Sequence, residues 1–163
     1  MIEMISAISK NKAIGKDNSL LWNIPEDMKH FVKTTKGKTV VMGSNTFFSI
    51  GKPLKNRRNI VLSRDPSKFK EYDVEVISDY NEILSLNEDV IIIGGEKIYN
   101  LFLEHTDILH LTVVDKEYDG DTFFPDYEDL FSIVKDSGEL TSSTEEQKYF
   151  IKAFKSDRSL DII

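Results

Sequence analysis

The stretch Asp89 to Ile93 is the part of the sequence that most constrains the fold. After its first residue it is apolar at every position, which predicts a short strand covered on both faces. The pair Gly94-Gly95 follows at once, and apolar residues then recur at helical spacing through Phe102. A buried strand that leads directly into a helix is typical of an α/β fold with a parallel sheet between layers of helices.

Similar patterns along the chain predict the remaining elements. The other expected strands are Met1–Ser9, Thr39–Met42, Asn59–Ser63, Val74–Ile77, Ile108–Val114, Phe131–Lys135 and Tyr149–Phe154. The other expected helices begin at Pro25 (fading between 34 and 37), at a cap on Ser44 or Asn45 (through Ile50) and at a cap on Asp79 (through Leu86). No helical pattern separates the last three strands, so we expect them to pair antiparallel.

These elements predict a single α/β domain over residues 1–163. Its central sheet is expected to be mostly parallel with antiparallel C-terminal strands, and helices are expected on both faces. Residues 156–163 are expected to form a frayed tail, since they continue none of these patterns. The sequence shows no repeat and no linker that would divide it.

Charge limits the kinds of partner that the chain can bind. The 163 residues carry a net charge of −7, which opposes binding to nucleic acid and to anionic membranes. We interpret the Lys and Arg residues as scattered among acids, with no basic stripe, so an anionic small ligand must be met by locally placed cations. We expect no nucleic-acid partner, no membrane partner and a monomer.

The rarest residue types exclude further classes of site. The chain has no cysteine, which excludes disulfides and thiolate chemistry. Its histidines, at positions 30, 105 and 110, show no pairing with nearby acids at metal-ligand spacing, so no metal site is expected. No leader sequence is recognisable at the N-terminus and no apolar run approaches bilayer length, which predicts a cytoplasmic protein.

Asp27 is the most unusual acid in the sequence. It lies in the first turn of the helix that begins at Pro25, where the helix dipole favours a negative charge. Phe31 follows four residues later, so the carboxylate shares a helix face with an aromatic ring. An acid in a first turn is most often only structural. A flexible loop that contains the chain's only tryptophan, Trp22, directly precedes this helix. This combination favours a functional role for Asp27.

Three expected strand ends carry residues suited to an anionic ligand. Gly94-Gly95 allows close approach of the backbone at a helix start, although such a pair often only makes a tight turn. The second strand end is Gly43 with Ser44, Asn45 and Thr46, and the third carries Ser63-Arg64. Two helix N-termini with cations beside one sheet suit a ligand that contains a pyrophosphate.

Several of these motifs together resemble those of the bacterial dihydrofolate reductases. The resemblance rests on Ile14-Gly15, Leu20–Pro25, Asp27, Gly94-Gly95 and Gly120–Pro125, and it runs from the first strand to about Tyr127. It implies an enzyme in which NADPH gives a hydride to 7,8-dihydrofolate to produce tetrahydrofolate. It also implies a cis peptide bond between the paired glycines, beside the nicotinamide.

The resemblance also assigns roles to individual residues. As catalytic residues it implies Asp27, Trp22 and Leu20. As substrate-binding residues it implies Ile5, Ala7, Asp27, Met28, Phe31, Ile50, Leu54, Arg57 and Thr112. As cofactor-binding residues it implies Ala7, Ile14, Gly15, Gly43, Ser44, Asn45, Thr46, Ser49, Leu62, Ser63, Arg64, Ile93, Gly94, Gly95, Glu96, Lys97, Ile98 and Tyr99. Apolar residues at such spacings usually fill cores, and Thr112 by itself is an ordinary strand residue.

The cofactor side departs from the family at one position. Ser44 stands after Gly43, where the bacterial enzymes typically have an arginine. The resemblance therefore implies that one partner of the 2′-phosphate is missing. We expect NADPH to be preferred over NADH through Arg64 and Lys97, but by a smaller margin.

The resemblance makes residues 15–23 a lid over the nicotinamide and the pterin. Leu20 and Leu21 are expected to be its apolar plug, and Leu21 replaces the usual proline, which predicts a more flexible lid. Asp121 is expected to hydrogen-bond the closed lid, whereas an ordinary Asx turn is the simpler alternative.

On the substrate side, a carboxylate can hold the amidine-like edge of a 2-amino-4-oxo ring with two hydrogen bonds. Burial should raise the pKa of Asp27, whereas the helix N-terminus and such a partner should lower it. Arg57 matches the arginine that binds the glutamate-tail carboxylate, and Arg58 is expected to be solvated. Diaminopyrimidine antifolates should bind the same acid.

Two other functions are compatible with the sequence. One is a related reductase that acts on a pyrimidine intermediate, as in riboflavin synthesis, although Asp27 with Arg57 fits a folate better. The other is a nucleotide-binding module without catalytic activity. An assay of NADPH absorbance with and without dihydrofolate distinguishes all three.

Overall fold

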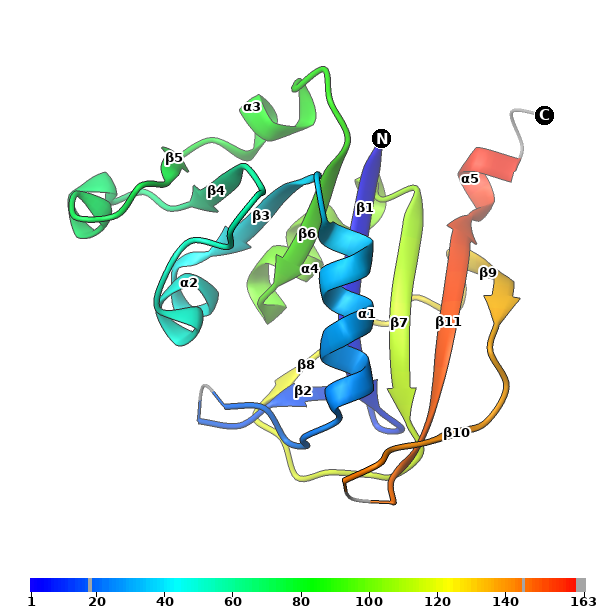
Figure 1. Cartoon of the computed structure of the whole chain (residues 1–163). Coiled ribbons are helices and arrows are strands. Elements are labelled where there is room, and N and C mark those ends of the chain that lie inside the picture. Colours follow the sequence, from blue (N-terminus) through cyan, green and yellow to red (C-terminus); the bar gives the residue numbers. More distant parts are fainter. Residues whose placement is uncertain (18, 145, 161–163) are drawn as a thin grey trace.

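The computed structural model describes residues 1–17, 19–144 and 146–160, and its main feature is a nine-stranded sheet (Figure 1). The strands lie in the order β10-β11-β7-β1-β6-β3-β4-β5, and β9 pairs with β11 beside this path. Their bounds are β1 (Ile2–Ser9), β3 (Thr39–Gly43), β4 (Asn59–Leu62), β5 (Glu75–Ile77), β6 (Val90–Gly94), β7 (Ile108–Val114), β9 (Phe131–Asp136), β10 (Leu140–Thr141) and β11 (Lys148–Ser156).

Strand directions confirm the predicted fold class. The pairs β1–β6, β1–β7, β3–β6, β3–β4 and β4–β5 are parallel, whereas β11 pairs antiparallel with β7, β9 and β10. The helices are α1 (Pro25–Thr35), α2 (Ser44–Ile50), α3 (Tyr80–Leu84), α4 (Glu96–Phe102) and α5 (Asp157–Leu160), with short 3-10 helices at Pro66–Phe69 and Leu103–His105. None of the helices in the described part of the chain is long and apolar enough to cross a membrane.

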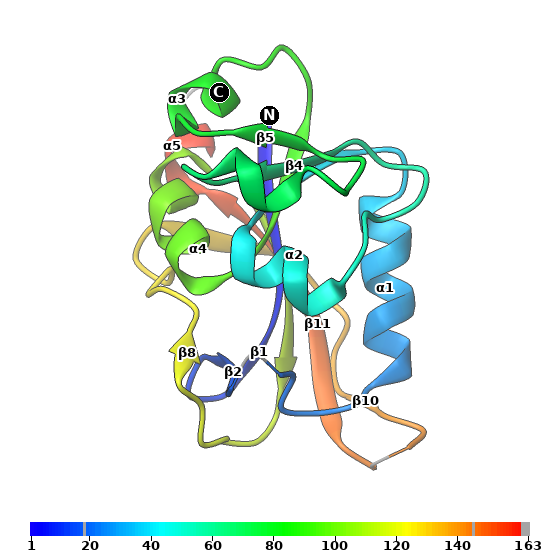
Figure 2. The ribbon, with the colours of Figure 1, turned by 90° about the vertical axis from the view of Figure 1, so that its left-hand side faces the viewer.

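The sheet separates two apolar layers, and α1 and α4 lie on opposite sides of it (Figure 2). The alternating side-chain directions along β3 show how the two layers arise. Val41 packs in the layer that contains Phe102 of α4, whereas its neighbours Val40 and Met42 pack in the layer that contains Phe47 of α2. Because successive side chains of a strand point to opposite faces, one short apolar run supplies both layers.

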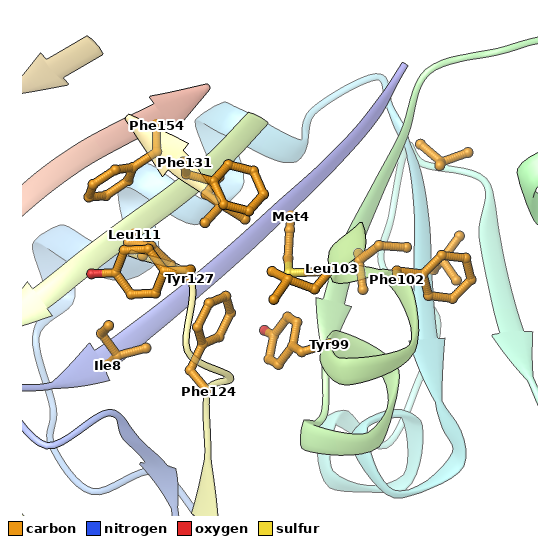
Figure 3. Close-up of a cluster of buried hydrophobic side chains, with 14 of the residues drawn as sticks. Met4, Ile8, Tyr99, Phe102, Leu103, Leu111, Phe124, Tyr127, Phe131 and Phe154 are labelled. Atoms are coloured by element: carbon orange, nitrogen blue, oxygen red, sulfur yellow. The ribbon is translucent and has the colours of Figure 1, made fainter. Parts of the chain in front are cut away.

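The layer on the α4 side is rich in aromatic rings (Figure 3). Phe124 lies between Tyr99 and Tyr127, with ring centroids 4.9 and 5.9 Å away. Tyr127 then contacts Phe154 of β11 at 5.2 Å. The segment after β7 is thereby fixed against the core, although most of it lies outside the regular elements.

Several local predictions differ from the structure. The N-cap of α2 is Gly43, so neither Ser44 nor Asn45 caps this helix, because β3 extends one residue further than expected and Ser44 is already helical. The predicted tail is wrong up to residue 160. β11 continues to Ser156, whose N–H donates to the carbonyl of Asp107, and α5 follows. Residues 161–163 lie outside the described part.

The sequence patterns also missed three short strands. β2 (Ala13–Gly15) pairs with β8 (Thr122–Phe123) in a separate two-stranded sheet, and β10 pairs with β11. These strands have two or three residues each, which is too short for an alternating pattern to identify.

Candidate active site

The predicted site residues meet at the carboxyl ends of the parallel strands. β6, β3 and β4 are neighbours, and their register places Met42 opposite Gly94 and Gly43 opposite Leu62. On the other side of β6, β1 pairs with β7 so that Ala7 lies opposite Thr112. Ligands of open α/β sheets bind at this edge, because the loops that follow parallel strands gather there.

Asp27 is joined to the sheet through Thr112. Pro25 begins α1, and Asp27 lies in the first turn as predicted. The Thr112 hydroxyl, buried on β7, donates a hydrogen bond of 2.7 Å to Asp27 Oδ1. The carboxylate is therefore fixed at the junction between the helix and two central strands.

Burial raises the pKa of Asp27 above its ordinary value, and it outweighs the opposing effect of the hydrogen bond from Thr112. Among the groups of the protein itself, burial therefore has the larger effect on this pKa. A carboxyl group with a raised pKa in a partly enclosed position is suited to hold or transfer a proton at a higher pH than an exposed carboxyl group.

Trp22 lies in the segment that directly precedes α1. Its side chain is 7% exposed, and its ring centroid lies 5.3 Å from that of Tyr118. Ala7 and Leu21 pack against the same cluster. The segment before α1 is held by two further contacts from the loop after β10. The Thr144 hydroxyl donates to the carbonyl of Asn23, and the Ser143 N–H donates to Glu26.

Apolar residues predicted to bind substrate divide into a wall and a rim. Ile5, Phe31 and Leu54 belong to one apolar cluster on the α1 side of the sheet. Met28 and Ile50 are 56% and 38% exposed. We therefore assign the first three to the wall of the site and the last two to its rim.

The loop between α2 and β4 brings Arg57 to this side of the sheet. The side-chain amide of Asn59 donates to the carbonyls of Leu54 and Arg57 and accepts from the Leu54 N–H, which fixes the shape of the loop. The Nε atom of Arg57 is buried, and it has no hydrogen-bond partner among the described residues. A cation held in this way is suited to bind an anionic group of a ligand.

Arg58 is exposed, as predicted, but it also forms ion pairs that the sequence did not indicate. Its guanidinium forms hydrogen bonds of 2.6 and 2.7 Å to Glu75 and of 2.9 Å to Glu88. The sequence did not indicate these pairs, because the two acids lie 17 and 30 residues away and meet Arg58 only through strand pairing and a loop.

The strand ends at Gly43 and at Gly94-Gly95 leave little room for side chains at these glycines. A cis peptide bond joins Gly94 and Gly95, as the resemblance implied. A Cβ atom on Gly94 would lie 3.2 Å from the hydroxyl of Tyr99, and one on Gly95 would lie 3.4 Å from Thr46 Oγ1. The Tyr99 hydroxyl donates a hydrogen bond of 2.7 Å to the carbonyl of Ile5, which connects α4 to β1. The raised pKa of Tyr99, caused first by burial, keeps its proton available for this bond.

Gly43 is the tightest of these positions, since a Cβ atom there would lie 2.9 Å from Ile98 Cγ1. The N-caps Gly43 and Gly95 make no side-chain hydrogen bond, so the first N–H groups of α2 and α4 remain available to a ligand. Backbone donors at these helix starts fit the pyrophosphate of a dinucleotide. The structure thus fits NADPH on this side.

A Gly43→Ala substitution is expected to raise the KM for NADPH by about tenfold or more. The added methyl group must displace Ile98 and change the spacing of the two helix starts, a loss of about 1.4 kcal/mol or more in binding. Cofactor titration by fluorescence and the KM for NADPH measure the change. Ser85→Ala, at an exposed serine outside the predicted cofactor-binding residues, is the control. An unchanged KM in the Gly43 variant would contradict the proposed contact surface.

The remaining predicted cofactor residues differ in their depth. Ile14, Leu62, Ile93 and Ile98 are half-buried apolar residues that pack against the core. Ser63 and Ser44 are half-buried, whereas Asn45, Ser49, Arg64 and Lys97 are exposed. Glu96 differs from the others because its carboxylate accepts a hydrogen bond from the backbone N–H of Phe123. It therefore connects α4 to β8.

The predicted lid is attached to the same region through β2 and β8. Asp121 Oδ2 accepts a hydrogen bond of 2.9 Å from the backbone N–H of Asp17, which confirms the predicted contact with the lid. Gly15 is buried, and its carbonyl accepts from the Asp121 N–H. Of the lid residues, Asn18 lies outside the described part.

The two leucines predicted to form the apolar plug of the lid differ in exposure. Leu20 is 69% exposed, whereas Leu21 packs beside Trp22 and Tyr118. The physical reason is the tight turn between Lys16 and Ser19, closed by two backbone hydrogen bonds, after which Leu20 points outward.

The interpretation of the cations as scattered among acids is also wrong. Residues 28–64 contain nine Lys or Arg and no Asp or Glu, although the whole chain has 28 acids and a net charge of −7. Counting the charges along the sequence would have found this segment. It contains α1 after its first turn and the loop that carries Arg57.

Comparison with known proteins agrees with this arrangement. Residues 1–156 match the family described as dihydrofolate reductase. A dihydrofolate reductase type 3 of Salmonella typhimurium is 45% identical over 130 residues, which cover 78% of this chain and 80% of that protein. A dihydrofolate reductase of Staphylococcus aureus is 41% identical over 126 residues, which cover 77% and 79%.

The fold is also shared with a solved structure. A dihydrofolate reductase from Enterococcus faecalis, complexed with NADP(H) and RAB-propyl, superimposes with a TM-score of 0.87 at 28% identity over 96% of both chains. The chain therefore belongs to the dihydrofolate reductase family, the NADPH-dependent oxidoreductases that convert 7,8-dihydrofolate to tetrahydrofolate.

Proposed function

We propose that Asp27 holds the pterin ring of dihydrofolate and supports its protonation during reduction. The bond between Thr112 and Asp27 carries this proposal, because it fixes the acid on the helix that also carries Phe31, whose side chain packs in the same apolar cluster as Ile5. The carboxylate can accept two hydrogen bonds from the 2-amino-4-oxo edge of the ring. Trp22 is suited to position a water molecule next to the ring nitrogen that receives the proton.

The other side of the site is proposed to hold NADPH, which supplies the hydride. Gly43 and Thr46 would contact the pyrophosphate, Gly94 and Gly95 would border the nicotinamide, and Arg64 would lie near the adenosine ribose. We infer a preference for NADPH over NADH, reduced in size by Ser44. The ratio of kcat/KM for the two cofactors measures it, and a preference for NADH would contradict this part.

The lid is proposed to close over both ligands and exclude water during the reaction. Asp121→Ala removes the acceptor for the Asp17 N–H, so the closed form loses a charge-assisted hydrogen bond on an exposed segment. We expect kcat/KM for dihydrofolate to fall roughly threefold to thirtyfold with little change in melting temperature.

The neighbouring acid Asp119 provides a matched control for the lid. It forms an exposed salt bridge of 2.7 Å with Lys16, and such pairs contribute little to stability because water and salt screen them. Asp119→Ala should therefore leave kcat/KM within about threefold of the parent. Equal losses in the two variants would show that the lid contact of Asp121 has no special role.

An absorbance assay tests the reaction itself. NADPH absorbance should fall only when dihydrofolate is added, and a diaminopyrimidine should block the reaction by pairing with Asp27. Loss of absorbance with a pyrimidine intermediate instead, or binding of NADPH without turnover, would favour the two alternative functions. We infer further that the chain acts as a single-domain monomer in the cytoplasm, which sedimentation and cell fractionation test.

A further inference from the structure

The contact between Trp22 and Tyr118 joins two segments that are far apart in the sequence. Tyr118 lies in the segment between β7 and β8, whereas Trp22 lies directly before α1. Their ring centroids are 5.3 Å apart, and their planes are inclined by 58°. Aromatic pairs attract each other at such distances beyond the effect of their buried area, and each ring limits the directions that the other can take. The orientation of the Trp22 ring therefore depends on where Tyr118 is held.

The backbone of Tyr118 is fixed by the side chain of Asn11. The Tyr118 N–H donates to Asn11 Oδ1 at 3.1 Å, and the side-chain amide of Asn11 donates to the Tyr118 carbonyl at 2.8 Å. Asn11 Oδ1 also accepts a hydrogen bond from the hydroxyl of Ser9, a buried residue at the end of β1. These bonds hold Tyr118 in one position relative to β1, although Tyr118 lies outside the regular elements.

The side chain of Tyr118 has two further contacts that fix its ring. Its hydroxyl donates to Gln147 Oε1 at 3.2 Å, and the ammonium group of Lys116 lies 5.1 Å from the ring centroid. Gln147 belongs to the loop between β10 and β11, the same loop that donates a hydrogen bond to the carbonyl of Asn23. This loop therefore holds the residue after Trp22 directly and the ring beside Trp22 through the tyrosine hydroxyl.

The apolar cluster that contains Trp22 extends to the strands that support Asp27. Ala7 and Ile151 pack against this cluster. In the register of the sheet, these two residues are the partners of Thr112 on β1 and on β11. Thr112 in turn donates to the carboxylate of Asp27. The tryptophan ring and the acid are therefore supported by the same part of β1, β7 and β11.

We propose that Tyr118 is a positioning residue that sets the plane of the Trp22 ring. This inference rests on the proposed function, in which Trp22 positions the water molecule next to the ring nitrogen that is protonated. A proton is transferred only across a short hydrogen bond, so a displaced water molecule slows protonation. Any large apolar side chain could cover Trp22, whereas the bonds of Tyr118 to Asn11 and Gln147 give its ring a fixed direction.

Trp22 is the only tryptophan of the chain, so its fluorescence reports directly on this contact. In a Tyr118→Leu variant without ligands, the indole loses the ring beside it and gains contact with water. Its emission should therefore shift to longer wavelength. Tyr118→Phe keeps the ring and removes the hydroxyl, and its emission should match that of the parent. Asn11→Ala should shift the emission in the same direction as Tyr118→Leu, and the double variant should show no larger shift than Tyr118→Leu alone.

The pH dependence of the rate separates positioning from a purely structural role. Proton supply decreases as the pH rises, so kcat of Tyr118→Leu should fall about tenfold at about pH 9 and about twofold or less at about pH 6. Tyr118→Phe should restore kcat to within about twofold of the parent at both pH values. The KM for dihydrofolate should change little in either variant, because the proposed effect is on protonation and not on substrate binding.

Tyr80→Leu is the matched control. Tyr80 is also half-buried and contacts an aromatic ring, that of Phe102 at 5.9 Å, but it packs in a different cluster from Trp22. Its loss should lower the melting temperature without changing the emission or the pH dependence of kcat.

Two results would overturn the positioning role. One is parental emission in both Tyr118→Leu and Asn11→Ala, and the other is an equal fall of kcat at all pH values in Tyr118→Leu. Asn11→Ala leaves the aromatic cluster unchanged, so it provides the same test if the Leu variant does not fold. Absence of NADPH oxidation with dihydrofolate in the parent would instead contradict the proposed function, and the emission would still test the contact between the two rings.

Discussion

Replacing Asp27 by Asn is expected to lower kcat near neutral pH by a factor of about 10²–10⁴, the range that general acid–base catalysis contributes. The amide has nearly the same shape, and it can still accept the hydrogen bond from Thr112. The amide has no negative charge with which to hold the ring, and it cannot take part in proton transfer. Single-turnover measurement of NADPH oxidation shows the loss, and titration with NADPH should show unchanged cofactor binding.

The same substitution should stabilise the fold at neutral pH. The folded-state pKa of Asp27 is raised above its ordinary value of 3.8 by burial, so the ionised carboxylate destabilises the folded state. This penalty is complete above the raised pKa, decreases as the pH falls through it and vanishes below about 3.8. The Asn variant should therefore melt at a higher temperature than the parent at pH 7–8, and the difference should disappear in acid.

A Thr112→Val variant provides the control for this assignment. It keeps the shape of the side chain and removes the hydroxyl that lowers the pKa of Asp27. The pH dependence of kcat/KM should then shift toward higher pH, while the maximal rate falls less than in the Asn variant. Two results would count against Asp27 as the catalytic acid. One is a kcat of the Asp27→Asn variant at neutral pH equal to that of the parent, and the other is an unchanged pH dependence of kcat/KM in the Thr112→Val variant.

The second large effect is expected for Arg57. Arg57→Gln should raise the KM for dihydrofolate about tenfold to a hundredfold, because hydrogen bonds between charged groups contribute roughly 1.5–3 kcal/mol. The unpartnered Nε atom indicates that no described residue competes for this guanidinium. The change should appear in KM rather than kcat, since the tail lies away from the reacting carbon.

Arg58→Gln is the matched control beside it. This variant loses the bonds to Glu75 and Glu88, so it should lower the free energy of unfolding by about 1 kcal/mol while KM stays within about twofold of the parent. Urea unfolding and steady-state kinetics on both variants separate the two roles. A larger rise of KM in the Arg58 variant would reverse the assignment of the two arginines.

The sequence by itself determined the fold class and the identity of most elements. Apolar strands such as 90–93 and the helix begun by Pro25 are governed by local periodicity and by backbone preferences, which neighbouring residues specify. The position of Asp27 in a first turn and the glycines at strand ends follow from the same local rules. Periodicity could not find β2 and β8, which exist because the two distant segments pair with each other.

Only the tertiary structure decided the environment of the charged groups. The direction of the pKa shift of Asp27 depends on how much water the packed strands exclude and on the hydroxyl of Thr112, which is 85 residues away in sequence. The different states of Arg57 and Arg58 depend on which acids the sheet brings within reach. Desolvation and pairing are set by contacts between segments distant in the chain, and local sequence preferences do not specify them.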